Sequence, residues 1–433
     1  MHFLHPSSLD CCKSELDLFT VLPTQTSILE SNFISINPVN SVTNADVPVE
    51  FHIPGNSEHY LDPSNIFLYL KVKLVNEDGT DLSGDDHIVY PTSNFLYSCF
   101  NQLEVFLNEV SLGSSAANYP YRTFIETLLN FSEDAKYSHL QSTGFYSLKD
   151  ESKIVDAISK RSSKVHDFYG RLNGDIFSQD RLLLPAVDVR VRLSRSAAPF
   201  ALNVHSKPTA ATQAPSPIFQ IQDAYLYVRK VKLSAQRHME IEKSLITSTA
   251  KYPVRRVETK IFNFATGLTT INLSNVVMGQ LPQKLIVGMV EHAAFAGNYK
   301  KNPYKIAPFG LRELSLHVNG QPYGRPYKTL YNNGEGLCAR AFYDLIANTV
   351  SCSDIGTGIN KADFSTNTNL YAFDLTADLT GNAGSHLNVV KHGTMGLTFT
   401  FEKPLTSAIS IIVYMEYQHL VEIDRVRNIL LSY

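Results

Sequence analysis

The stretch QLEVFLNE at residues 102–109 reappears as ELSLHVNG at residues 313–320, about half of the 433-residue chain further on. In both copies apolar residues alternate up to an asparagine, Asn108 or Asn319, which is typical of a strand that enters a hairpin. The repeat therefore predicts two similar β domains in one chain, with Asn108 and Asn319 at equivalent hairpins.

Each copy continues through a Tyr/Pro-rich connection into a short pattern with apolar residues at helical spacing. These residues are Phe124, Ile125, Leu128 and Leu129 in the first copy, and Phe342, Tyr343, Leu345 and Ile346 in the second. The repeated unit is thus a strand, a turn and a helix.

Length and charge narrow the class of protein. At roughly 100–200 residues per domain the chain has room for two to four domains, and the repeat selects two. The 38 basic and 41 acidic residues give a formal charge of −3, without the basic excess of proteins that grip nucleic acid. Residues 1–20 contain a single basic residue, Lys13, so no polycationic tail is predicted.

Cysteine usage and the N-terminal sequence indicate the compartment. The five cysteines, Cys11, Cys12, Cys99, Cys338 and Cys352, are odd in number and irregularly spaced, which favours free thiols in a reducing compartment. Neither a signal peptide nor an apolar run long enough to span a membrane is recognised. We expect a protein made in the cytosol, not secreted, without a membrane span.

Short alternating apolar segments between polar loops favour antiparallel sheets over a parallel βαβ arrangement. Strands are predicted at 47–53, 66–75, 187–193, 218–233, 260–264, 269–273, 283–290, 311–318, 397–401 and 409–417. About eight strands per half predict an all-β fold of two tandem antiparallel jelly rolls with short helices in the loops. The predicted division is an arm at 1–46, a first roll at 47–245, a second roll at 246–428 and a tail at 429–433.

Motifs that carry chemistry are weak. GEGLCA at residues 334–339 fits a dinucleotide-binding spacing, but it follows a turn where a parallel βαβ unit is required. His2, His5, Cys11 and Cys12 lie in an unpatterned arm and do not predict a metal site. We therefore expect no enzyme, no catalytic residue, no cofactor and no metal.

One group of basic residues is a candidate site: Arg190, Arg192, Arg229, Lys230 and Lys232, on two alternating strands. As a stripe they could face nucleic acid. Alternating charges also mark the solvent face of a sheet or salt bridges between subunits, and this second interpretation is favoured.

Several longer runs resemble one known family. They are SELDLF at 14–19, PTQTS at 23–27, YLD at 60–62, LYLKVK at 68–73, YPYR at 119–122, YPVRRVE at 252–258, GQLP at 279–282, GNYKKNP at 297–303, AFDLT at 372–376 and EIDR at 422–425. In these runs the chain resembles the major capsid proteins of Polinton/Maverick elements and adintoviruses.

The resemblance implies a double jelly-roll subunit, a homotrimeric pseudo-hexameric capsomer and an icosahedral capsid around double-stranded DNA. It also implies contacts with neighbouring capsomers, a separate penton or minor capsid protein, and a place in the virion after assembly in the nucleus or cytoplasm. The alternative is a β-sandwich binding protein, such as a lectin or a virion receptor-binding protein. That alternative predicts an aromatic or carboxylate-lined pocket and no self-assembly.

Overall fold

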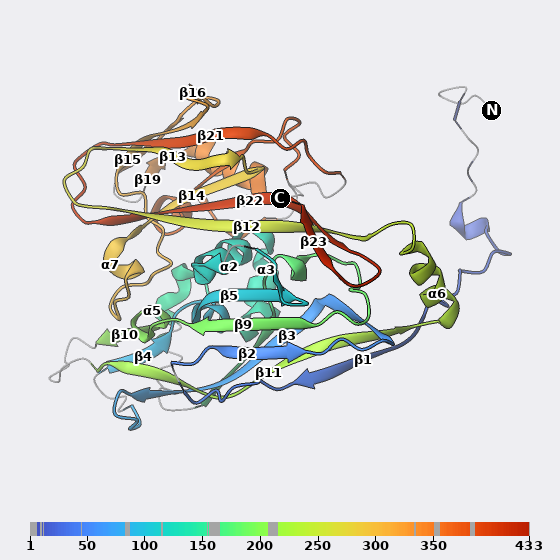
Figure 1. Cartoon of the computed structure of the whole chain (residues 1–433). Coiled ribbons are helices and arrows are strands. Elements are labelled where there is room, and N and C mark those ends of the chain that lie inside the picture. Colours follow the sequence, from blue (N-terminus) through green and yellow to red (C-terminus); the bar gives the residue numbers. More distant parts are fainter. Residues whose placement is uncertain are drawn as a thin grey trace.

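The structure is a computed structural model of the chain. It describes residues 7, 8, 11, 13–44, 46–82, 87–113, 116–153, 155, 165–206, 215–332, 335–349, 356–381 and 386–432. Two β-sandwiches lie one above the other, and the N-terminal segment extends away from both (Figure 1).

The first sandwich is a jelly roll, in which consecutive strands alternate between two facing sheets. One sheet has the order β1 (Ile28–Ile36), β11 (Pro217–Leu233), β3 (His59–Asn76) and β8 (Val165–Arg171). The other has the order β2 (Val49–Ile53), β9 (Val189–Arg195) and β5 (Phe100–Leu107), with the short β6 (Val110–Ser111) and β7 (Ala116–Ala117) beside β5. Numbered along the chain, with β6 and β7 taken together as the fifth strand, the sheets read 1-8-3-6 and 2-7-4-5.

The second sandwich repeats this order. Its sheets are β12 (Ala250–Phe264), β22 (Ile409–Ile423), β14 (Lys284–Glu291) and β20 (Leu370–Asp374), and β13 (Thr270–Gln280), β21 (His392–Phe401) and β15 (Leu311–Val318) with β16 (Gln321–Pro322) and β17 (Tyr327–Lys328). A further strand, β23 (Ile429–Ser432), pairs with β22. All the paired strands of the two rolls are antiparallel, so the predicted pair of jelly rolls is confirmed.

Helices and small ribbons fill the loops. The α-helices are α1 (Phe95–Ser98), α2 (Tyr119–Asn130), α3 (Glu133–Tyr137), α5 (Ala198–Ala201), α6 (Ala235–Ser244), α7 (His292–Phe295), α8 (Ala339–Thr349) and α9 (Lys361–Thr366). The 3-10 turns are η1 (Ser14–Leu16), η2 (His139–Thr143), η3 (Leu148–Asp150) and η4 (Ile176–Ser178). The ribbons pair β4 (His87–Pro91) with β10 (Leu202–Ser206), and β18 (Leu330–Asn332) with β19 (Glu335–Leu337).

The predicted arm of residues 1–46 needs correction, because β1 is the first strand of the first roll. In the second half of β1 only the side chains of Ile34 and Ile36 are partly buried. This alternation of apolar and polar residues is too short to predict a strand from the sequence. The predicted tail at 429–433 likewise contains β23. The boundary near residue 245 stays a prediction; α6 lies between the last strand of one roll and the first of the other.

The two repeated asparagines occupy equivalent two-residue hairpin turns. Asn108 and Glu109 have φ of 43° and 68°, and Asn319 and Gly320 have φ of 52° and 76°. Positive φ at both central residues defines the turn that suits the twist of two antiparallel strands, and asparagine tolerates it. The equivalence read from the sequence repeat is therefore confirmed.

Each asparagine side chain also ties its hairpin to the neighbouring strand. Oδ1 of Asn108 accepts from the backbone N–H of Asp188 at 2.8 Å, and Oδ1 of Asn319 accepts from that of Thr394 at 2.8 Å. Asn108 alone makes a further bond, because its Nδ2 donates to the carbonyl of Arg427 at 2.9 Å. The repeat thus preserves a contact as well as a turn.

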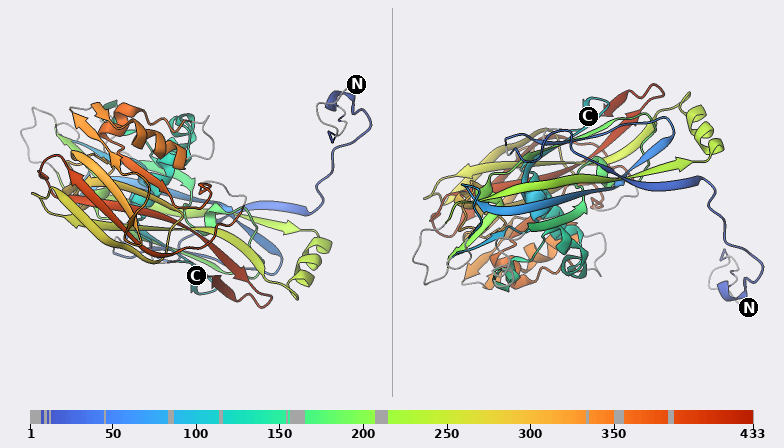
Figure 2. Two further views of the ribbon diagram at one scale, coloured as in Figure 1. Left: turned by 90° about the horizontal axis from the view of Figure 1, so that it is seen from above. Right: turned by 90° about the horizontal axis from the view of Figure 1, so that it is seen from below.

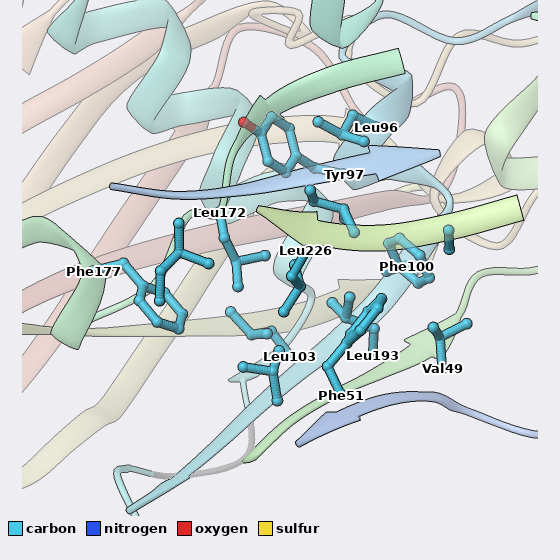
Figure 3. Close-up of a cluster of buried hydrophobic side chains, with 14 of the residues drawn as sticks. Val49, Phe51, Leu96, Tyr97, Phe100, Leu103, Leu172, Phe177, Leu193 and Leu226 are labelled. Carbon is cyan, nitrogen blue, oxygen red and sulfur yellow. The ribbon is translucent and has the colours of Figure 1, made fainter. Parts of the chain in front are cut away.

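Inward-facing side chains of each roll form a close-packed apolar layer, and Figure 3 shows the first, with Phe51, Phe100, Leu193 and Leu226 meeting between the sheets. The two cores also cross the boundary between the rolls. Tyr252, Val254, Val421 and Ile423 of the second roll pack into the first core. Tyr121, Phe124, Ile125, Leu128 and Leu129 of α2 pack into the second. The rolls therefore share a buried boundary.

Candidate functional site

Helix α2 carries a buried ion-pair network at the boundary between the rolls. The guanidinium of Arg122 contacts Asp175 (Nη2–Oδ1, 2.7 Å) and Glu126 (Nε–Oε1, 3.2 Å). From the second roll, the hydroxyl of Tyr414 donates to Glu126 at 3.2 Å, and the backbone N–H of Val257 donates to Asp175 at 3.3 Å. Both rolls thus contribute to one polar cluster.

The cluster continues on the outer face of the second roll through Glu416. Its carboxylate accepts from Tyr414 at 2.7 Å and pairs with Lys284 at 3.3 Å and Arg255 at 3.6 Å. With Arg122, three basic groups face three acidic ones, so the buried charge is balanced.

Burial and pairing oppose each other in the pKa of these groups. Burial alone would raise the pKa of Glu416, but Arg255 and Lys284 hold it below the usual range. Burial alone would lower the pKa of Arg122, but Asp175 and Glu126 raise it above the usual range. At Asp175 burial prevails and the pKa is raised. Such a cluster fixes the relative orientation of two bodies, since removing one partner leaves a buried charge unpaired at about 3–5 kcal/mol.

The predicted basic stripe is divided between the two sheets of the first roll. Arg190 and Arg192 lie on β9, where Arg190 pairs with Glu50 at 3.3 Å and Glu109 at 2.9 Å, and Arg192 pairs with Glu104 at 3.6 Å. These cations are therefore matched by carboxylates of their own sheet.

The remaining stripe residues lie on β11. Arg229 pairs with Asp62 at 2.9 Å, Lys232 with Glu58 at 3.4 Å, and Lys230 donates to the carbonyl of Pro54 at 3.1 Å. The structure does not join the two groups into one sheet face, and it balances most of their charge within the chain. A role at a subunit contact or at the genome stays a prediction.

A cavity of about 590 Å³ opens between the rolls, lined by residues from both, including Phe145, Ile359 and Asp363. The ammonium of Lys136 crosses the boundary there, donating to the carbonyls of Leu128 at 2.5 Å and Thr357 at 2.6 Å. Burial lowers the pKa of Lys136 to about 8. The cavity wall is thus a further link between the rolls.

The other motifs acquire no chemical setting. Gly334 of the GEGLCA run lies outside the described residues, and β19, which follows it, pairs antiparallel with β18. Within the described ranges no three His, Cys, Asp or Glu side chains gather as a metal site; His2, His5 and Cys12 fall outside those ranges. In the part of the chain that the structure describes, no helix is long and apolar enough to cross a membrane.

Sequence reasoning missed the buried network. A signal was present, because Arg122 and Glu126 stand four residues apart on α2, and Arg340 and Asp344 stand four apart on α8. An Arg–acid pair at the same position of both repeated helices indicates an ion pair that each helix can form.

No family model matches the chain. An uncharacterised protein of Caenorhabditis elegans is 22% identical over 424 residues, covering 94% of this chain and 98% of that protein.

Solved structures similar to the chain include three from viruses. A structure of the Sputnik virophage matches 98% of this chain and 93% of its own at 10% identity, with a TM-score of 0.67. The PBCV-1 virus capsid matches 96% of this chain and 99% of its own at 13% identity, with a TM-score of 0.62. The mavirus major capsid protein matches 100% of this chain and 95% of its own at 10% identity, with a TM-score of 0.56. The chain has the fold of double jelly-roll capsid proteins. At such identities the likeness concerns the fold.

Proposed function

We propose that this chain is a major capsid protein, the structural subunit of an icosahedral shell around double-stranded DNA. One observation carries the proposal: both halves have the strand order 1-8-3-6 and 2-7-4-5, and this double roll matches viral capsid chains over nearly the full length of each. The proposed lineage is that of Polinton/Maverick elements and adintoviruses, on the sequence runs given above.

The duplicated roll suggests how such a subunit tiles a surface. Three copies around a threefold axis present six similar sandwiches, and a near-hexagon can cover a closed shell with few kinds of contact. The balanced composition and the scarcity of basic residues in the first twenty support a subunit that leaves DNA condensation to other proteins. The partners are then further copies of the chain and a penton or minor capsid protein, in the virion, without catalytic activity.

The experiment is purification of the full chain followed by light scattering and negative-stain microscopy over a range of salt concentrations. The proposal predicts a particle of three times the 48.3 kDa chain mass, with a six-lobed outline, that assembles further into shells. A chain that stays monomeric at every salt concentration and binds a small molecule or a glycan would instead indicate a β-sandwich binding protein.

A further inference from the structure

The helix that follows the repeated hairpin is itself repeated. YRTFIETLLN at residues 121–130 aligns with ARAFYDLIAN at residues 339–348, which places Arg340 at the position of Arg122 and Asp344 at that of Glu126. Both pairs form an ion pair within their helix, at 3.2 Å on α2 and 3.4 Å on α8. The two helices are therefore equivalent in sequence and in their internal ion pair, whereas within their own rolls α2 packs on β5 and α8 packs on β20.

Their surroundings differ sharply. The side chains of Arg122 and Glu126 are 6% and 4% exposed, because the second roll covers them, whereas those of Arg340 and Asp344 are 53% and 29% exposed. On α8 the exposed side also carries Tyr343, which is 73% exposed. Within one chain, α8 thus has the recognition pair of α2 without the sheet that covers it.

The covering sheet of α2 is the outer face of β12-β22-β14-β20. The eighth strand of the second roll, β22, lies in this sheet and contributes Tyr414, whose hydroxyl donates to the carboxylate of Glu126. Residues 409–417 of β22 are buried without interruption, as expected for a strand with a core on one face and a neighbour on the other. In the contact between the two rolls, the first roll therefore contributes a helix, and the second contributes the outer face of its 1-8-3-6 sheet.

Among the described residues, the equivalent face of the first roll is exposed to solvent, as at Phe33 and Tyr169. Its sheet lies on the side of the molecule away from the second roll, and it faces the viewer in the right-hand view of Figure 2. Aromatic rings that contact one another on the outward side cross all four of its strands: Phe33, Phe67, Tyr69, Tyr169, Tyr225 and Tyr227. We call this set the aromatic face.

The rings of the aromatic face pack on one another. Tyr69 and Tyr225 stack with centroids 4.4 Å apart, Phe67 and Tyr169 stack at 5.4 Å, and Phe33 remains 55% exposed. Aromatic clusters in contact with water are typical anchors of protein interfaces. The eighth strand of the first roll, β11, thus carries the outward tyrosines Tyr225 and Tyr227, as the eighth strand of the second roll, β22, carries Tyr414.

We propose that the aromatic face binds the α8 side of a second copy of this chain, repeating between copies the contact that α2 makes with the second roll within one copy. The inference rests on the proposed trimer and assigns its contact surfaces. Tyr225 and Tyr227 take the place of Tyr414, with a hydroxyl that donates to the Asp344 carboxylate of the neighbouring copy. Tyr343 packs on the rings.

This contact is head-to-tail, since the helix of one copy meets the sheet of the next. Such heterologous contacts build either an open filament or a closed ring, according to the rotation between neighbours. In the proposed trimer the step between chains repeats the step inside a chain, and six rolls from three chains form the ring. The proposal gives a partner to the exposed side of α8, whose other side packs on β20 of its own roll.

The experiment places a charge on each side of the contact. Tyr227→Glu on the aromatic face and Tyr343→Glu on α8 are each expected to reduce the light-scattering mass from three chains to one. Met239→Glu on α6, which is also exposed, is the matched control and is expected to keep the trimer. Circular dichroism spectra like that of the unmodified chain and a cooperative thermal transition show that the variants fold. The thermal midpoint itself is expected to fall with the loss of the trimer. Met239 and Tyr343 are exposed and Tyr227 is half-buried in the single chain, so none of the three changes places a charge in a core.

Crosslinking gives an independent readout without a buried charge. A chain carrying both Tyr227→Cys and Tyr343→Cys, treated with a short bismaleimide, is expected to form covalent dimers and trimers, and each single variant only the background of the native thiols. If the Glu variants remain trimers and the double variant does not crosslink above background, the inference is overturned while the proposed function stands. If the unmodified chain is not a trimer, the proposed function itself fails.

Discussion

The last strands of the two rolls, β11 and β22, have the same place in the same strand order and opposite surroundings. In β11 exposure alternates from Tyr225 to Val228, so one face meets the core and the other meets solvent. In β22 residues 409–417 are buried on both faces. The same strand position is thus covered within the chain in the second roll and exposed on one face in the first, which leaves the first roll a face for the contact proposed above.

The largest expected effect separates the two helices. Arg122→Met leaves Glu126 and Asp175 buried without a cation, so the free energy of unfolding should fall by about 3–5 kcal/mol. Arg340→Met at the equivalent exposed pair should cost about 0–1 kcal/mol in the isolated chain. Denaturant unfolding of both variants is measured in the Tyr227→Glu background, where no neighbouring copy is expected to cover α8. Equal costs there would contradict the covered and open assignments.

The boundary can also be probed through pH. The folded-state pKa of Lys136 is about 8, below the ordinary 10.5, because burial disfavours the charged form. Between these two values the unfolded chain holds a proton that the folded chain lacks. Stability should therefore rise as pH rises through this window, by up to about 3 kcal/mol relative to Lys136→Met, with the full penalty present below it. Unfolding of both proteins from pH 7 to 10.5 measures this, and parallel curves would speak against a buried ammonium.

The paired hairpins offer a finer comparison. Asn319→Ala should lower the free energy of unfolding by about 2 kcal/mol, because alanine is strained at positive φ and one side-chain hydrogen bond is lost. Asn108→Ala should cost about 1 kcal/mol more, because Asn108 alone also reaches the carbonyl of Arg427. Asn→Gly at both positions is the control that keeps the turn and removes the side chain. A larger loss at Asn319 would reverse the comparison.

The smallest effect is expected in the basic stripe. Arg192→Ser breaks a half-exposed pair with Glu104 and should change the free energy of unfolding by about 0–1 kcal/mol. In assembled particles the triple variant Arg190→Ser, Arg192→Ser and Arg229→Ser distinguishes the two interpretations of the stripe. Impaired assembly with unchanged DNA content indicates subunit contacts, and the reverse indicates a surface that faces the genome.

The sequence predicted the parts of the fold that local pattern determines. Strands such as β3 and β15 alternate cleanly, and the two asparagine turns carry their own φ preference, so the double roll followed from them. β1 was missed because most of its side chains face solvent and only Ile34 and Ile36 of its later residues mark a core side.

The candidate site was harder to predict because it depends on which faces meet in space. Arg190 and Arg229 of the basic stripe both lie on alternating strands of the first roll, yet these strands belong to different sheets. Arg122 and Glu416 are far apart in the chain and belong to one buried cluster. The sequence contains the repeated Arg–acid pair of α2 and α8. Only the packing of the rolls shows that the pair on α2 is buried and the pair on α8 is exposed.

We expect the two rolls to occupy equivalent places around a threefold axis. A cryo-EM reconstruction of the purified oligomer addresses it directly. We expect six similar lobes from three chains, with α8 of each copy seated on Tyr225 and Tyr227 of the next. A map in which the aromatic face is open to solvent, or in which the rolls of neighbouring copies meet through other faces, would contradict the account.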